Sequence, residues 1–80
     1  MKTSKIKTRL FLLHFHFVIN EKFRAAKRLL DLIRGRSITL GCYNDQDNEL
    51  YLRLSAMGLQ YCVSYRTGAV TFYASDITKD

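Results

Sequence analysis

The stretch LFLLHFHFVI, residues 10–19, is the longest apolar run in the chain, and the interpretation of the other segments depends on it. With a period of two residues it has one wholly apolar face and one mixed face, which carries His14 and His16. A strand that is apolar on both sides is typical of the middle of a sheet. The run therefore predicts a central strand whose core face consists of Phe11, Leu13, Phe15, Phe17 and Ile19.

A basic amphipathic segment follows this run directly. Asn20 is a favourable N-cap, Glu21 suits the positive end of a helix, and Gly35 suits the position just past its C-terminus. Between them, apolar residues recur at helical spacing. The sequence predicts a helix over residues 21–34 that covers the sheet with Phe23, Ala26, Leu29, Leu30 and Ile33.

After Gly35 the apolar pattern changes to a period of two, which predicts four strands. We expect them at residues 37–43, 49–55, 59–65 and 69–75, with a polar turn at 44–48, a turn at 57–58 and a hairpin loop at 66–68, where Gly68 supplies a positive φ. We also expect a basic arm at residues 1–8 and a polar tail at 76–80. The order β-α-β-β-β-β predicts a single α+β domain over residues 1–80, with one amphipathic helix packed on a curved antiparallel sheet. In element order it resembles a cystatin-like roll, which implies a sheet wrapped around one helix.

The charge of this 80-residue chain is unevenly distributed. Residues 1–36 hold ten Lys and Arg against two acidic residues, a net +8, whereas residues 37–80 hold three against five, a net −2. Such a local basic field favours an anionic partner, either nucleic acid or an acidic or nucleoprotein surface. The predicted binding residues on the helix and its flanks are Lys22, Arg24, Lys27, Arg28, Arg34 and Arg36.

Aromatic residues provide a second candidate surface. In the predicted strands, Tyr43, Tyr51 and Tyr73 fall on the faces opposite the aliphatic residues, beside Arg53. A sheet that presents aromatic side chains and arginine can stack unpaired bases, and the same composition suits a protein–protein interface. Strand propensity and dimer packing explain these tyrosines equally well.

His14 and His16 are the residues that bear most directly on catalysis. On a strand, both imidazoles would lie on the same face, about 7 Å apart. Such a pair suits a metal site or acid–base chemistry on a phosphodiester, but the sequence offers neither a third ligand nor an orienting partner. We therefore expect no catalytic residues, no metal and no cofactor.

The cysteines and the acidic residues suggest no further site. Cys42 and Cys62 lie far apart and predict two buried, reduced thiols in a cytoplasmic protein. Residues 45–49 lack the spacing and the glycine of a calcium loop. The basic start of the chain resembles a signal peptide, but the histidines and the absence of a cleavage site argue against export, and the apolar run is too short to cross a membrane.

The sequence thus predicts a small non-enzymatic binding protein that engages nucleic acid or a nucleoprotein complex through its basic arm and helix. A homodimer is a further expectation. The alternative is a phage- or plasmid-type inhibitor or adaptor, anti-CRISPR-like, that binds a protein partner. A third and more remote hypothesis is a metal-independent ribonuclease toxin that uses His14 and His16. We expect no membrane partner.

Overall fold

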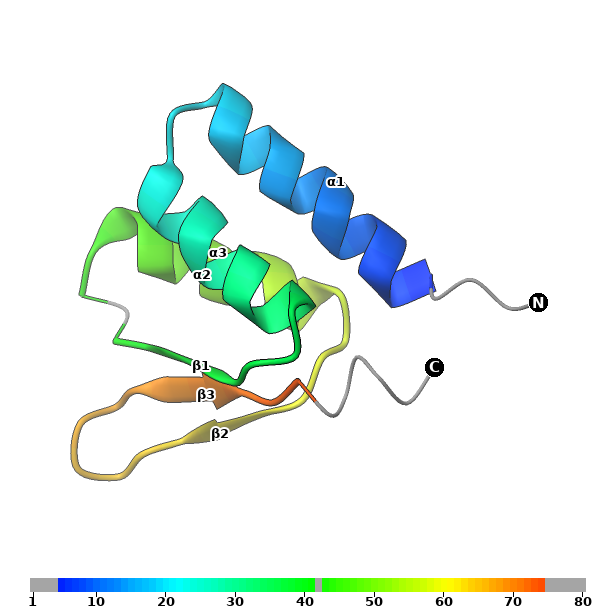
Figure 1. The fold of residues 1–80 in the computed structure, drawn as a ribbon. Helices are drawn as coiled ribbons and strands as arrows, with labels where there is room; N and C mark the ends of the chain where they lie inside the picture. The colour runs from blue at the N-terminus through cyan, green and yellow to red at the C-terminus, as the bar shows by residue number, and fades with distance from the viewer. Residues whose placement is uncertain (1–4, 42, 75–80) are drawn as a thin grey trace.

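The computed structural model describes residues 5–41 and 43–74, which form three helices and a three-stranded antiparallel sheet (Figure 1). In chain order the elements are α1 (Lys5–Ile19), α2 (Phe23–Ile33), β1 (Ile38–Leu40), α3 (Asp45–Ala56), β2 (Tyr61–Val63) and β3 (Val70–Phe72). The predicted α+β class is confirmed. The predicted order β-α-β-β-β-β, with a single helix and a cystatin-like roll, is not found.

The apolar run at residues 10–19 is helical, so the prediction of a central strand is wrong. Leu10 and Phe17 are fully buried and Leu13 is partly buried, at the spacing of one helix face, and this face packs against α2. A run that is apolar at nearly every position satisfies the strand and helix periods equally, and its length was the better guide, because a typical strand has about five or six residues. α1 forms the layer farthest from the sheet (Figure 1).

The end of α1 also differs from the expected N-cap at Asn20. The backbone N–H of Glu21 donates to the carbonyl of Val18, and that of Lys22 donates to the carbonyl of Phe17, which is a Schellman C-cap. Glu21 occupies the left-handed position of this motif, with a φ of 58°. The Asn20 side chain donates to the His16 carbonyl at 2.8 Å, so Asn20 ends α1 instead of starting α2.

The helix predicted at residues 21–34 is confirmed as α2, and Gly35 ends it as predicted, with a φ of 95°. Its buried face is broader than expected because α2 contacts α1, α3 and β1. This face comprises Ala25, Ala26, Leu29, Leu32 and Ile33. Phe23, expected in the core, is 60% exposed, and Leu30 is only partly buried.

α3 replaces the predicted turn at 44–48 and the predicted strand at 49–55. Asn44 is its N-cap, since the side-chain oxygen accepts a hydrogen bond from the Asp47 N–H at 2.8 Å. Leu50 and Leu54 are buried one turn apart, whereas Leu52 is 56% exposed. The alternation of leucines that predicted a strand therefore placed Leu52 on the wrong face.

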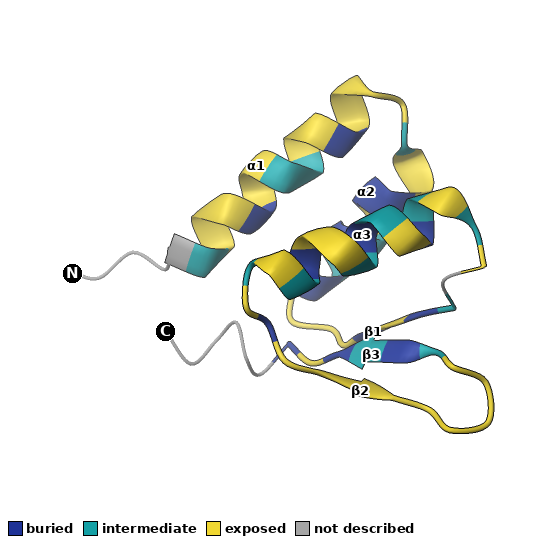
Figure 2. Cartoon of the chain, turned by 180° about the vertical axis from the view of Figure 1, so that it is seen from behind, coloured by how far each residue is buried: buried dark blue, intermediate teal, exposed yellow. Residues whose placement is uncertain are grey.

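The sheet follows the prediction more closely, with shorter strands. The central strand β3 pairs with β1 and β2, in the order β1-β3-β2. Its inward residues Val70 and Phe72 are buried together with Ile38 and Leu40 of β1, whereas all three residues of the edge strand β2 are exposed. β2 and β3 form the predicted hairpin, and Gly68 in its loop has the expected positive φ, 71°. α2 and α3 cover the inner face of this sheet (Figure 2).

Two predicted segments fall partly or wholly outside the described residues. α1 begins at Lys5, so the second half of the expected arm at residues 1–8 belongs to this helix, and residues 1–4 are outside the description. The expected tail at 76–80 is outside it as well.

Candidate functional site

The exposed side of α2 carries most of the predicted basic residues. Because α2 buries its opposite side, the helical repeat brings these side chains onto one surface, which we call the basic face and define as Arg24, Lys27, Arg28 and Arg34. Arg24, Lys27 and Arg28 line a hollow of about 300 Å³ together with Asp31. Asp31 is the single acidic residue of α2.

Arg24 is partly occupied by a contact with α3. Its Nε and Nη2 atoms lie 3.3 and 3.4 Å from the two carboxylate oxygens of Asp47. Asp47 is only 2% exposed and also accepts a hydrogen bond from the Asn44 side-chain amide at 3.2 Å. The guanidinium of Arg24 is therefore held in place at one end of the hollow, with half of its surface still exposed.

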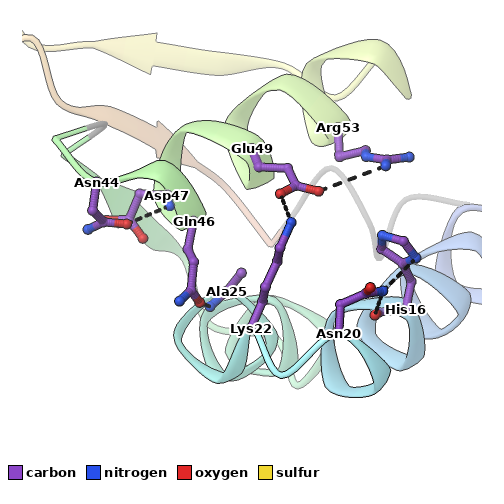
Figure 3. A network of polar contacts seen from close by, with 9 residues as sticks. All are labelled: His16, Asn20, Lys22, Ala25, Asn44, Gln46, Asp47, Glu49 and Arg53. Atoms are coloured by element: carbon purple, nitrogen blue, oxygen red, sulfur yellow. Dashed lines mark hydrogen bonds and ion pairs between the residues drawn. The ribbon is translucent and has the colours of Figure 1, made fainter.

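Lys22 and Arg53 belong to a polar network that joins α2 to α3 (Figure 3). The Lys22 ammonium forms an ion pair with Glu49, whose second carboxylate oxygen lies 3.8 Å from Nη2 of Arg53. Both cations are thus partly neutralised within the chain. They contribute to the packing of the two helices and are weaker candidates for binding a ligand than the sequence indicated.

Gln46 completes this network by capping α2. The N-cap residue of α2, Lys22, makes no side-chain capping bond. Instead, the Gln46 side-chain oxygen accepts a hydrogen bond from the Ala25 N–H at 3.1 Å, across the interface between α2 and α3 (Figure 3). A backbone N–H in the first helical turn has no acceptor within its own helix, and here another helix supplies one.

Four predicted cations remain available. Among the described residues, no carboxylate pairs with Lys27, Arg28, Arg34 or Arg36. Lys27, Arg34 and Arg36 are exposed and Arg28 is partly exposed. Guanidinium groups suit phosphate because they present two parallel N–H donors, and lysine adds a mobile positive charge.

Phe23 is a functional candidate that the sequence assigned to the core. It lies one helical turn before Lys27, on the exposed side of α2. An exposed aromatic ring next to cations resembles the stacking positions of proteins that bind single strands. Its position in the sequence could have indicated this exposure, because the side chain of the first residue of a helix can extend past the core.

The predicted tyrosine surface is not assembled. Tyr51 and Arg53 lie on α3, so they are not on the sheet, and the Tyr51 hydroxyl is 3.2 Å from that of Tyr61. Tyr43 is exposed, but its hydroxyl donates to the Thr67 carbonyl at 2.9 Å. Tyr73 follows β3 directly and is exposed, as expected.

Tyr73 interacts with Cys62, its neighbour across the hairpin. A hydrogen bond to the Cys62 side chain and the negative charge of its thiolate raise the pKa of the Tyr73 hydroxyl. Cys62 is a free, exposed thiol, so the expectation of a buried residue is wrong for it, and Cys42 is outside the described residues.

His14 and His16 do not share a face. On α1 they project about 200° apart, because successive residues of an α-helix are rotated by about 100°. His16 is exposed, with Nδ1 3.4 Å from the Asn20 side-chain nitrogen, and His14 is partly buried. The strand geometry that suggested joint action on a phosphodiester is therefore wrong.

The described part of the chain contains no cluster of three or more His, Cys, Asp or Glu residues placed to hold a metal ion. The acidic stretch at 45–49 lies in α3, where Asp45 and Asp47 occupy the first turn, at the positive end of the helix. Within residues 5–41 and 43–74, none of the helices has the length and hydropathy that crossing a bilayer requires.

A comparison of the chain with protein-family models, curated proteins and solved structures finds no match.

Proposed function

We propose that this is a non-enzymatic protein that binds nucleic acid through the basic face of α2. The observation that carries the proposal is the hollow lined by Arg24, Lys27 and Arg28, in which Asp31 is the only opposing charge among the lining residues. A concave surface with a net positive charge suits the phosphate groups of a nucleic-acid backbone.

The charges around the hollow extend this surface. Arg34 and Arg36 continue it past the C-terminal end of α2, where cations are also favoured by the helix dipole. With Lys27 and Arg28 they make four cations that have no carboxylate partner in the described residues. Four phosphate contacts imply a log–log salt slope of about −3 to −4.

Phe23 supports a preference for single strands. Its exposed ring, beside Lys27, can stack on an unpaired base while the cations contact the backbone. Stacking of this kind requires no particular base. We therefore propose binding of single-stranded nucleic acid without strong sequence preference.

Fluorescence anisotropy with labelled single-stranded and duplex oligonucleotides, measured over a salt series, tests the proposal. The triple variant Lys27→Gln/Arg28→Gln/Arg34→Gln should lose at least about tenfold in affinity and reduce the salt slope by about two to three. The control is Arg66→Gln, which removes an exposed arginine from the hairpin loop. Phe23→Ala should weaken single-strand binding by roughly 5- to 100-fold and duplex binding much less.

The proposal is wrong if the parent protein binds neither oligonucleotide at low salt, or if the triple variant binds as well as Arg66→Gln. In that case the alternative function, an inhibitor or adaptor for a protein partner, takes precedence. Affinity purification with nuclease treatment would then recover a protein in fixed stoichiometry.

A further inference from the structure

α1 presents a second apolar face, opposite the one that packs on α2. We call it the outer face, and its residues are between 37% and 66% exposed: Phe11, Leu12, Phe15, Val18 and Ile19. They fall within an arc of about 120° around the helix, turned away from the buried Leu10 and Phe17. The exposed side of α1 is continuous along its length (Figure 2).

The outer face is large for a protein of this size. Large apolar side chains carry about 150–250 Å² each, so five of them at these exposures leave roughly 500 Å² of apolar surface in contact with water. The largest apolar patch on a typical monomer covers about 300–600 Å² and is often functional. Two such faces packed together would bury up to about 1,000 Å², which is the lower limit for a biological interface.

The charge distribution identifies a second copy of the chain as the occupant. Residues 10–20 contain no Lys, Arg, Asp or Glu, so two outer faces can meet without burying a charge. Arg9 lies just before this segment and Glu21 just after it, both are exposed, and neither forms an ion pair within the described residues. If two helices lie antiparallel and cross at Phe15, Arg9 of each copy comes level with Glu21 of the other, so opposite charges flank both ends of the contact.

We propose that the protein is a homodimer in which two copies of α1 pack antiparallel across a two-fold axis at Phe15. This axis places Phe11 opposite Ile19 and Leu12 opposite Val18, so the contact is self-complementary. The antiparallel arrangement also brings the positive end of each helix next to the negative end of the other. α2 and the sheet lie on the far side of α1, where they do not obstruct a second copy (Figure 1).

The dimer goes beyond the proposed function and does not depend on it. The outer face lies on α1 and the basic face on the exposed side of α2, so a variant can break either one while leaving the residues of the other unchanged.

Sedimentation velocity of the full chain over a wide concentration range tests the proposal. The apparent mass of the parent protein from sedimentation should be twice the 9.3 kDa of one chain. Phe15→Glu should raise the dimer dissociation constant by roughly 30-fold or more, because it buries two like charges at the axis. Leu52→Glu on α3, where the leucine is equally exposed, should leave the dimer intact. Circular dichroism checks that each variant keeps its helices.

A charge exchange tests the antiparallel arrangement. Arg9→Glu and Glu21→Arg should each weaken the dimer severalfold, and the double variant should recover most of the parent affinity. Failure of the double variant to recover would overturn the antiparallel arrangement.

The homodimer is refuted if the parent stays monomeric at every concentration, or if Leu52→Glu dissociates it as much as Phe15→Glu does. The proposal is equally overturned if the parent is a monomer that co-sediments with phosphatidylserine vesicles and Phe15→Glu abolishes this vesicle binding. The outer face would then bind a membrane surface.

Discussion

Replacing Gln46 by alanine removes the cap that α3 supplies to α2. The Gln46 oxygen is the acceptor for the Ala25 N–H at 3.1 Å, and Ala25 is fully buried. Leaving a buried donor without an acceptor costs about 1–3 kcal/mol, and losing a helix cap costs about 0.5–2 kcal/mol. Both figures describe the same bond, so we expect Gln46→Ala to lower the free energy of unfolding by about 1.5 kcal/mol.

In a domain of this size, 1 kcal/mol corresponds to roughly 4–8 °C in Tm, so the midpoint should fall by about 6–12 °C. Thermal unfolding followed by circular dichroism at 222 nm (a wavelength that reports helix content) measures this, together with urea titration. Asn48→Ala is the matched control, because Asn48 is exposed in the same first turn of α3. Gln46→Glu keeps an acceptor oxygen and should stay closer to the parent than Gln46→Ala. If Gln46→Ala is as stable as Asn48→Ala, the cap between helices contributes nothing and the reasoning fails.

Three further predictions concern stability and ionisation. Glu21→Gly should be more stable than Glu21→Ala by about 0.5–1 kcal/mol. Both variants lack the carboxylate, and only glycine removes the left-handed strain of about 1–2 kcal/mol, at some cost in chain entropy. Equal stability of the two variants would contradict this. At a protein concentration where the chain is monomeric, Phe17→Ala should cost about 3–5 kcal/mol in a urea titration, against less than about 1 kcal/mol for Phe15→Ala. Similar losses would mean that α1 packs on α2 through another face. In an ultraviolet titration the pKa of Tyr73 should lie above the ordinary tyrosine range, because its hydroxyl keeps its proton beside the Cys62 thiolate. Cys62→Ala should return the pKa of Tyr73 to that range. An unchanged pKa in this variant would exclude the contact.

If both proposals hold, the dimer presents two basic faces on one assembly. Two linked binding surfaces raise the apparent affinity for a long nucleic acid through effective concentration. Phe15→Glu would then weaken binding to long strands and leave binding to short ones nearly unchanged.

Local signals in the sequence determined the parts of the fold that depend on a few neighbouring residues. The α2 helix and its end at Gly35 followed from an amphipathic pattern with a C-terminal glycine, and the β2–β3 hairpin followed from alternation around Gly68. The sequence Asn44-Asp45-Gln46-Asp47 also carries an N-cap signature, which the alternation of the following leucines concealed. The uneven charge was likewise visible at once, and it led to the cations of the basic face.

Only the tertiary structure decided the state of residues 10–19 and the roles of the charged residues. An apolar run satisfies both periods, and α2 offers α1 a face to pack on, so the run is helical and its other apolar side is exposed. Whether Lys22 and Arg24 are available to a ligand depends on Glu49 and Asp47, more than twenty residues away, which no local pattern connects to them. His14 and His16 also point in different directions because they lie on a helix, and the backbone conformation sets the angle between two side chains.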